Sequence, residues 1–356
     1  MSTPSRSLPL ASAGSPITAV ALALPELADS WLVACRSDQL RSNPIARTLN
    51  GLPIVLFRDA AGHAVALEDR CPHKNVALSL GRVTRGTLEC RYHGWRIEPG
   101  GAVVDVPCHA PDERVPACRV PTFSVQEQDD WIWVSLGANS EGPPSYPQLS
   151  GYGWFELENV VAAPIDLVLE NGLDCSHTGF AHEGLFRSAP TQFVSADLEE
   201  TPTGVRVETI EESPRRSWDV RRILGRRREI RHVDEIVLPH TLRVDYRMGE
   251  DVHVITVLVC TPETAQRTRL HTRMGVRHGV LTPLITRYVE WLTRRIVAQD
   301  LAVLTSQAER IHQFGGRDFR GVTADLPAAW YQRCAQRAAR GAADRPLRRR
   351  RIEYRL

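Results

Sequence analysis

Two short cysteine–histidine pairs constrain this chain more than any other feature of its sequence. One residue separates Cys71 from His73, and two residues separate Cys90 from His93. Sixteen residues lie between the two pairs. Thiolates and imidazoles are the ligands that soft and borderline transition metals prefer. The sequence therefore predicts that two loops meet around a metal and that the first part of the chain folds about them.

The mixing of one cysteine with one histidine in each pair favours iron and sulfur over zinc. Structural zinc sites of the Cys₂His₂ type usually pair cysteine with cysteine and histidine with histidine. Two thiolates on one iron and two imidazoles on the other describe a Rieske [2Fe–2S] cluster, in which the imidazoles raise the reduction potential. We expect Cys71, His73, Cys90 and His93 to hold such a cluster, with structural zinc as the alternative.

These pairs, followed by Gly94 and Trp95, resemble the Rieske domain of ring-hydroxylating oxygenases. One departure from the family pattern is Arg91, where a small or uncharged residue is more familiar. A fixed cation beside the cluster should favour its reduced form and raise its potential. The resemblance implies a second, catalytic domain, for which a chain of 356 residues has room.

Asp174, His177 and His182 match the family's Asp-x₂-His-x₄-His pattern for mononuclear iron. Two histidines and one carboxylate on one face of the metal form the facial triad of non-heme Fe(II) oxygenases. We therefore expect His177 and His182 to bind Fe(II). Residues five apart do not share a helix face, so the helix predicted from Pro164 should distort or end between them, at Gly179.

Asp300 is the predicted third iron ligand. It interrupts the apolar stripe of a long helix predicted from 282 to 312, in which Thr282 can cap and Pro283 suits the first turn. Ile296 and Val297 precede it and Val303 and Leu304 follow it, so its side chain should face the core. A buried carboxylate is costly unless it is paired or coordinates a metal. Pairing with an arginine, or a place at the edge of the stripe, is the alternative.

The same helix carries two rival carboxylates, Glu290 and Glu309, whose neighbours are polar or basic. Both fit the third ligand position less well than Asp300. The resemblance gives Asp174 another role, a hydrogen bond to the cluster ligand His93 of a neighbouring subunit, which implies a homotrimer. Alternatively, Asp174 orients His177 within one chain.

The resemblance and the short strand-like runs predict an α+β protein. A mostly antiparallel Rieske domain, with its metal loops at hairpin tips, should precede a catalytic domain with a curved antiparallel sheet covered by helices. A linker rich in Gly, Pro and Ser follows the first domain. We expect an N-terminal arm at 1–25, the Rieske domain at 26–140, the catalytic domain at 141–345 and a basic C-terminal tail at 346–356.

Composition agrees with a cytoplasmic protein. The cysteines show no disulfide-like spacing, no apolar run reaches the length of a membrane span, and the apolar run 17–24 is expected to be part of the arm rather than a signal peptide. Lys74 is the only lysine among 44 basic residues. The arginine-rich segment 215–231 and the tail lack an aromatic stacking pattern, so a solvated face, or a docking or lid loop, is favoured over nucleic-acid binding.

The chain has no Gly-x-Gly-x₂-Gly fingerprint and no plant-type ferredoxin cysteines. NAD(P)H should therefore act only indirectly, through a separate ferredoxin and/or ferredoxin reductase. The resemblance implies O₂ as cosubstrate and a small organic substrate. A length near 350 residues resembles single-component oxygenases that hydroxylate or demethylate, in secondary metabolism or aromatic degradation. A cis-dihydroxylating dioxygenase and a non-catalytic electron carrier or redox sensor are the alternatives.

The substrate pocket is the least predictable part of the sequence. Phe186, Trp218, His232 and His240 are candidate lining residues, although core or surface roles are equally compatible with their positions.

Overall fold

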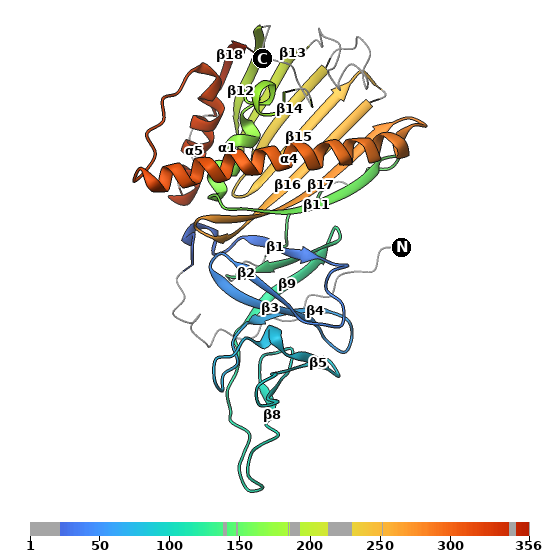
Figure 1. Cartoon of the computed structure of the whole chain (residues 1–356), viewed down its shortest axis with the longest axis vertical. Coiled ribbons are helices and arrows are strands. Elements are labelled where there is room, and N and C mark those ends of the chain that lie inside the picture. The colour runs from blue at the N-terminus through green and yellow to red at the C-terminus, as the bar shows by residue number, and fades with distance from the viewer. Residues whose placement is uncertain are drawn as a thin grey trace. The chain divides into compact units, whose positions relative to one another are not determined.

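The structure is a computed structural model that describes residues 22–137, 141–146, 149–183, 185, 193–212, 230–250, 252–341 and 347–355. The chain divides into two compact units, Met1–Pro147 with Thr261–Ala265, and Gln148–Cys260 with Gln266–Leu356. Both consist mainly of antiparallel strands, with the α-helices in the second unit (Figure 1). The predicted α+β class is confirmed.

The first unit contains two antiparallel sheets. The six-stranded sheet has the order β1-β10-β9-β4-β3-β2, and the four-stranded sheet has the order β5-β6-β7-β8. The elements, which include two short 3₁₀ helices, are η1 (Pro25–Leu27), β1 (Trp31–Arg36), β2 (Ile45–Leu49), β3 (Leu52–Arg58), β4 (Ala64–Glu68), η2 (Leu78–Leu80), β5 (Arg82–Thr84), β6 (Thr87–Glu89), β7 (Arg96–Ile97), β8 (Val103–Asp105), β9 (Thr122–Gln128) and β10 (Trp131–Ser135).

The hairpin of β2 and β3 turns on Asn50 and Gly51, both of which have positive φ, 49° and 88°. Two such residues between paired strands form the kind of tight turn whose twist matches that of the sheet. The buried Asn50 amide also accepts a hydrogen bond from the Leu24 backbone N–H at 2.7 Å and donates one to its carbonyl at 2.8 Å. The turn therefore fixes the segment that precedes η1.

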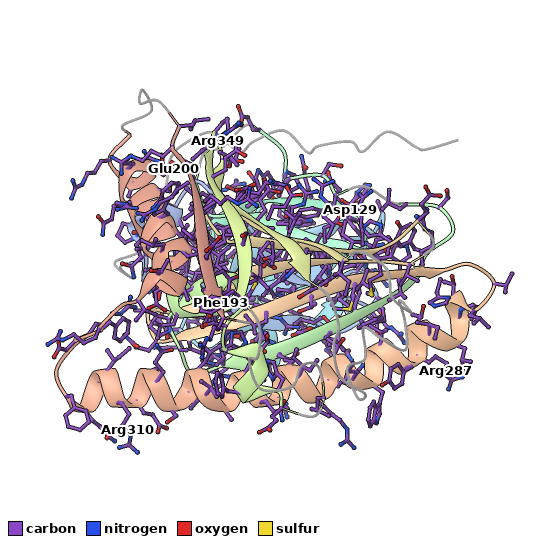
Figure 2. The ribbon with its side chains drawn as sticks, turned by 90° about the horizontal axis from the view of Figure 1, so that it is seen from above. Asp129, Phe193, Glu200, Arg287, Arg310 and Arg349 are labelled. Atoms are coloured by element: carbon purple, nitrogen blue, oxygen red, sulfur yellow. The ribbon has the colours of Figure 1, made fainter. Side chains whose placement is uncertain are left out.

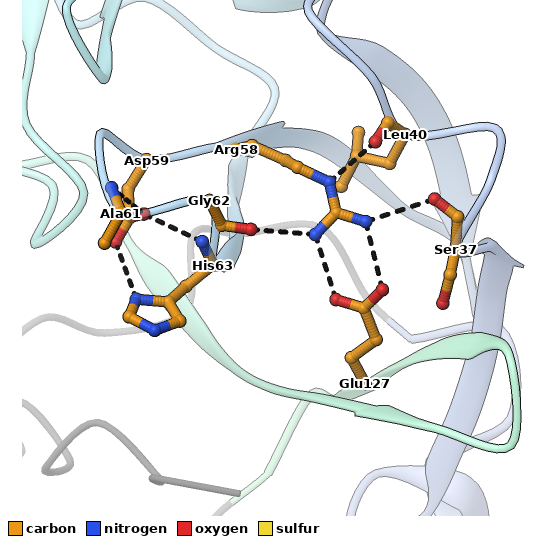
Figure 3. A network of polar contacts seen from close by, with 8 residues as sticks. All are labelled: Ser37, Leu40, Arg58, Asp59, Ala61, Gly62, His63 and Glu127. Carbon is orange, nitrogen blue, oxygen red and sulfur yellow. Dashed lines mark hydrogen bonds and ion pairs between the residues drawn. The ribbon is translucent and has the colours of Figure 1, made fainter. Parts of the chain in front are cut away.

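Arg58, at the end of β3, ties two loops of this unit to strand β9 (Figure 3). Its guanidinium donates to the carbonyl oxygens of Ser37, Leu40 and Gly62 at 2.7–3.1 Å and forms a two-pronged ion pair with Glu127 at 2.9 and 3.0 Å. A planar fork satisfied on all sides is the arrangement for which arginine is best suited.

We predict that Arg58→Met destabilises the first unit by about 2 kcal/mol, because three carbonyl oxygens and a carboxylate lose a charged donor together. Urea unfolding followed by hydrogen exchange, with peptides read separately for each unit, measures this loss. Arg41→Met is the matched control, since Arg41 donates to the Asp38 carbonyl in an exposed position. Equal losses in the two variants would contradict the prediction.

The same ion pair predicts a dependence of stability on pH. The hydrogen bond from Arg58 lowers the pKa of Glu127, against the effect of burial. A lowered folded-state pKa contributes stability above the unfolded value, about 4.3, and that contribution disappears as the pH falls through the folded value. The difference in unfolding free energy between the wild type and Glu127→Gln should therefore be largest at neutral pH and shrink below pH about 4.

The second unit is built on one eight-stranded antiparallel sheet of order β11-β17-β16-β15-β14-β13-β12-β18. Its elements are β11 (Gly153–Val161), α1 (Ile165–Leu173), α2 (Thr178–Ala181), β12 (Phe193–Thr201), β13 (Gly204–Glu212), β14 (Ile230–Val237), β15 (Thr241–Met248), β16 (Val252–Thr264), β17 (Arg267–His278), α4 (Thr282–Gln313), η3 (Thr323–Asp325), α5 (Leu326–Ala339) and β18 (Arg349–Arg355).

Three helices cover this sheet. α1 packs on β14 and β15, α4 packs on β11 and β17, and α5 packs on α1 and β13 (Figure 1). α4 runs close to its predicted bounds, with Pro283 in its first turn. Arg287 and Arg310 point outward from its solvent side (Figure 2), while Val289, Leu292 and Leu304 are buried beneath it. This amphipathic pattern places one face of α4 over the sheet.

The C-terminal segment differs from the expected basic tail. Residues 349–355 form β18, which pairs antiparallel with β12. Ile352 and Tyr354 are buried, whereas the arginines on the strand are exposed. Alternation of inward apolar and outward basic residues is what an edge strand requires. Most of the arginine-rich segment 215–231, and residues 1–21 of the expected arm, lie outside the described residues.

Candidate metal centres

Two loops of the first unit bring together the predicted cluster residues. Cys71 and Cys90 are each 2% exposed. The first loop leaves β4 and leads to η2, and the second joins the paired strands β6 and β7. Only the second loop is therefore a hairpin tip, because β4 pairs with β3 and β9 rather than with β5.

The second loop needs a glycine after its histidine. Gly94 has φ 72°, and a Cβ atom there would lie 3.1 Å from the Pro107 side chain. The backbone N–H groups of Cys90 and Gly94 donate to the Trp95 and Cys90 carbonyls at 2.8 and 3.0 Å. The glycine therefore lets the chain turn back within hydrogen-bonding distance of the cysteine, a conformation that costs other residues energy.

The two imidazoles of the predicted cluster site, His73 and His93, lie against each other, and His73 also lies against the Trp95 indole. The ring centroids of His73 and His93 are 4.5 Å apart, and Trp95 stacks on His73 at 4.8 Å with the planes 3° apart. His73 Nδ1 is buried and has no hydrogen-bond partner among the described residues. Burial, with the neighbouring Cys90, raises the pKa of the Cys71 thiol to about 11. Buried thiols beside an unsatisfied imidazole nitrogen fit a metal cluster.

The spread of these four residues argues against a single zinc ion. Across the described parts of the chain, two sets bring three metal-ligand atoms within 4.8 Å of one another, and both lie in the second unit. Tetrahedral zinc would gather all four ligands about one point. A two-iron cluster, which holds two ligands at each end, fits the observed residues better.

In the second unit, His177 and His182 lie at the two ends of the four-residue helix α2. The expected break at Gly179 is wrong, because Gly179 lies inside α2 and the interruption comes earlier, at Asp174. The Asp174 Oδ1 accepts hydrogen bonds from Ser176 N at 2.8 Å and Ser176 Oγ at 2.6 Å. An aspartate side chain that binds the following backbone in this way competes with helix continuation and ends α1.

The two histidines converge on Asp300, which comes from α4. Asp300 Oδ1 lies 3.4 Å from His177 Nε2 and 3.2 Å from His182 Nε2. These side chains form one of the two compact ligand sets. Buried Asp300 Oδ1 makes no hydrogen bond of good geometry within the described structure. The donor set and its open oxygen fit one ion of the kind that two histidines and a carboxylate hold on one face.

The predicted apolar surroundings of Asp300 on α4 are only partly observed. Leu304 is 2% exposed, but Val303 is 50% exposed, so the apolar stripe turns away from Asp300 at that point. The side chain of Asp300 itself is 20% exposed. Its ionic contacts in the described structure are with histidines, whereas the alternative had an arginine partner.

A neighbouring amide orients His182. Gln299 Oε1 lies 2.9 Å from His182 Nδ1, so that nitrogen donates to the amide oxygen and Nε2 faces Asp300. Gln299 was not among the predicted site residues. A hydrogen bond to the second ring nitrogen fixes the tautomer that binds a metal.

Asp174 lies on the other side of His177, with Oδ2 3.7 Å from His177 Nδ1. Burial alone would lower the pKa of His177, but Asp174 and Asp300 raise it to about 9. Burial acts to raise the pKa of both carboxyls, yet the neighbouring imidazoles, and Ser176 at Asp174, hold those pKa values below the ordinary range. The site therefore favours carboxylates in their charged form, the form that binds a cation.

A cavity of about 280 Å³ opens beside this set. Its walls are mainly aliphatic side chains from β15, β16 and α4, and Asp174, His177, His182 and Asp300 lie at one side. His232 lines the cavity, together with Asp234 and Cys175. His240 is buried but does not line it. Phe186 and Trp218, the other candidates, lie outside the described residues.

Comparison with known proteins gives the family. Residues 30–124 match the model of the Rieske [2Fe-2S] domain. Residues 161–341, more than half of the chain, match the model of the vanillate O-demethylase oxygenase C-terminal domain. The chain belongs to the Rieske oxygenase family. The resemblance drawn from the cysteine–histidine pairs and the Asp-x₂-His-x₄-His pattern is confirmed.

This Rieske oxygenase has relatives of several kinds. It is 27% identical over 281 residues to the protein TIC 55, chloroplastic, of Arabidopsis thaliana, covering 75% of this chain and 50% of that protein. It is 30% identical over 166 residues to the dicamba O-demethylase oxygenase component of Stenotrophomonas maltophilia, covering 43% of this chain and 47% of that protein. The chain thus spans about half the length of these relatives.

The fold of the Rieske oxygenase matches a solved relative along most of its length. The crystal structure of dicamba monooxygenase bound to dicamba superposes with a TM-score of 0.76 at 20% identity, covering 90% of this chain and 99% of that one.

In the described part of the chain, no helix is both long enough and apolar enough to cross a membrane.

We predict that Gln299→Leu weakens binding of Fe(II) to the His177, His182 and Asp300 set by about 10- to 100-fold, because His182 loses the acceptor that fixes its tautomer. Titration of metal-depleted protein with Fe(II) under anaerobic conditions measures the change. Gln307→Leu, a further position on α4, is the control and should leave the affinity unchanged. An unchanged affinity in Gln299→Leu would show that the amide has no orienting role.

Proposed function

We propose that this chain is the oxygenase component of a Rieske-type monooxygenase system. It would take electrons from a separate reductase through a [2Fe–2S] cluster to a mononuclear Fe(II), and use O₂ to hydroxylate, demethylate or otherwise oxidise a small organic substrate. The observation that carries the proposal is the convergence of His177 Nε2, His182 Nε2 and Asp300 Oδ1 beside a cavity with aliphatic walls.

In this proposal Cys71, His73, Cys90 and His93 hold the cluster, and His177, His182 and Asp300 hold the mononuclear iron. Iron at the second site would supply the redox chemistry that activates O₂. The protein's own contribution there is to hold His182 through Gln299 and to keep two nitrogens and one oxygen on a single side of the cavity. The aliphatic walls exclude water from the substrate's position.

Asp174 is proposed to link the two centres between subunits. Its Oδ1 is occupied by Ser176, and its Oδ2 faces His177. We propose that the carboxylate accepts a hydrogen bond from His93 of the partner subunit, in a ring of three copies of the chain. Asp174 Oδ2 lies 3.7 Å from His177 Nδ1, which supports a position for Asp174 beside the iron ligand, and one carboxylate can accept from several donors.

The reducing partners are proposed from what the chain lacks in sequence. With no nucleotide fingerprint, it would receive electrons from a ferredoxin and/or a ferredoxin reductase, and NAD(P)H would be oxidised there. A reducing compartment such as the cytoplasm suits the cluster. The relatives named as chloroplastic show that family members also work elsewhere, so the cytoplasmic location remains a prediction.

Monooxygenation is favoured over cis-dihydroxylation. The second half of the chain matches a family model named for an O-demethylase, and one relative is itself named an O-demethylase.

Metal analysis of two variants tests the assignment of the centres. We predict that His182→Ala loses mononuclear iron but retains acid-labile sulfide, whereas Cys90→Ala loses the sulfide together with the cluster's visible absorption, because each side chain serves a different centre. Anaerobic purification with iron, sulfide and zinc assays and electron paramagnetic resonance gives the readout. His63→Ala, with a side chain 58% exposed, is the control and should change neither content.

Zinc in place of iron, or iron without sulfide, in the wild type would refute the proposed function. Loss of sulfide in His182→Ala would contradict the separation of the two centres. Substrate-dependent O₂ uptake should require an added reductase, and turnover by the chain with NADH alone would contradict the proposed partners.

A further inference from the structure

The cavity of the second unit has a second polar group, formed by Cys175, His232 and Asp234, that the iron assignment does not use. We propose that Asp234 is a recognition site for a hydrogen-bond donor on the substrate. The substrate class is then an apolar molecule that carries an amine or another N–H or O–H group and no anionic group. This inference rests on the proposed function and deepens it by naming what the cavity selects.

Asp234 is held in place by two neighbours. Its Oδ1 lies 2.9 Å from His232 Nε2, and its Oδ2 accepts a hydrogen bond from the Cys175 thiol at 3.1 Å. The side chains of His232 and Asp234 are each 3% exposed. The His232 ring stacks on Tyr246 with centroids 3.8 Å apart and planes 15° apart. The carboxylate therefore has a fixed position on the cavity wall.

Strand geometry explains why these side chains face the cavity. His232 and Asp234 are two residues apart on β14, so they lie on the same face of the sheet. Asp234 is paired with Val244 and His232 with Tyr246 on β15, and both partners also line the cavity. Glu235, one position along β14, lies on the opposite face and forms an ion pair with Arg243 at 3.3 Å.

The carboxylate has capacity to bind a ligand. A carboxylate offers about four acceptor positions, and the contacts with His232 and Cys175 use two of them. A buried carboxylate is costly unless donors satisfy it. A substrate N–H or O–H entering the cavity would add a charge-assisted hydrogen bond, which is about twice as strong as a neutral one.

The rest of the lining selects against anions. Although the chain has 44 lysines and arginines, none is among the described residues that line this cavity. Three aspartates, Asp174, Asp234 and Asp300, do line it. An anionic substrate group near Asp234 would lose its hydration without gaining a basic partner from the lining, which is strongly unfavourable. The many aliphatic and methionine side chains account for the apolar remainder of the substrate.

The same three residues could instead bind a second metal ion, since their ligand atoms lie within 4.8 Å of one another. The histidine geometry favours the hydrogen-bonded arrangement. His232 directs Nε2 to Asp234 at 2.9 Å and Nδ1 toward the Cys175 sulfur at 3.8 Å, so its ring bridges the two side chains. A metal ion can bind only one nitrogen of the His232 ring. The contact of that nitrogen with Asp234 or with Cys175 would then be lost.

The test is calorimetric binding of three probes with one hydrocarbon skeleton to the anaerobic, resting holoenzyme. The probes are 3-phenylpropylamine, 3-phenylpropanol and 3-phenylpropionate. We expect the amine and the alcohol to bind at least about tenfold more tightly than the carboxylate, the factor expected for one charged hydrogen bond. Equal or tighter binding of the carboxylate, or binding of none of the three, would overturn the proposal.

Asp234→Asn identifies the residue responsible. It should reduce affinity for the amine by about tenfold or more and leave 3-phenylpropionate bound no less tightly. Glu235→Gln removes the same charge from the other face of the sheet and should leave the preference intact. Retention of the amine preference in Asp234→Asn, or its loss in Glu235→Gln, would refute the assignment. The wild-type probe series stands even if a variant does not fold.

Further outcomes distinguish this inference from a metal site and from the proposed function. Loss of one bound metal ion per chain in Asp234→Asn, with cluster and mononuclear iron retained, would replace the donor site by a metal site. Protein that contains iron and sulfide but shows no probe preference refutes the substrate class alone. Protein that shows the preference but no reductase-dependent O₂ uptake refutes the proposed function alone.

Discussion

A carboxylate placed on the inner side of a 32-residue helix must find cations or strong donors, and in this chain Asp300 finds two imidazoles. This contact joins α4 to His177 and His182 at the two ends of α2. The same three side chains form the charged part of the cavity wall. Around this contact the sequence supplies supporting interactions: Gln299 for His182, and Asp174 for His177. In the second unit, electrostatic contacts between α4 and the residues flanking α2 therefore accompany the apolar packing of α4 on the sheet.

The first unit follows the same rule with different ligands. Thiols and imidazoles are carried on two loops whose shapes are set by backbone hydrogen bonds, by a left-handed glycine at Gly94 and by a stacked indole at Trp95. The first of these loops leaves β4 of the six-stranded sheet, and Arg58 stabilises that sheet by binding the Leu40 carbonyl and Glu127 of β9. Binding chemistry on loops over a fixed scaffold is a common division of labour in proteins.

The sequence was most informative where chemistry depends on spacing along the chain. The cysteine–histidine pairs and Asp174, His177 and His182 are each separated by a few residues, so the pattern is visible without a fold. Asp300 was accessible through helix periodicity, because a charge on an apolar stripe is anomalous. Asn50 and Gly51 are also a typical hairpin pair in the sequence, and both lie with positive φ at the turn between β2 and β3.

What could not be predicted depends on contacts between distant segments. Gln299 is an unremarkable helix residue until His182 is placed 2.9 Å away. Cys175 reaches His232 and Asp234 only because α1 packs on β14, so the spacing of residues along the chain does not predict this contact. The strand β18 was hidden because its arginines resemble a solvated tail, while its two buried side chains are too few to show alternation clearly.

That last strand has a practical consequence for anyone who shortens or tags the protein. β18 occupies the outer edge of the sheet and shields β12, where Val194, Ala196 and Leu198 are almost fully buried. Its outward arginines discourage another chain from extending the sheet, since repeated positive charge opposes edge-to-edge association. Deleting β18 would leave β12 as an unpaired apolar edge strand that can self-associate. The first sign of this would be a low yield of soluble protein on expression rather than altered chemistry.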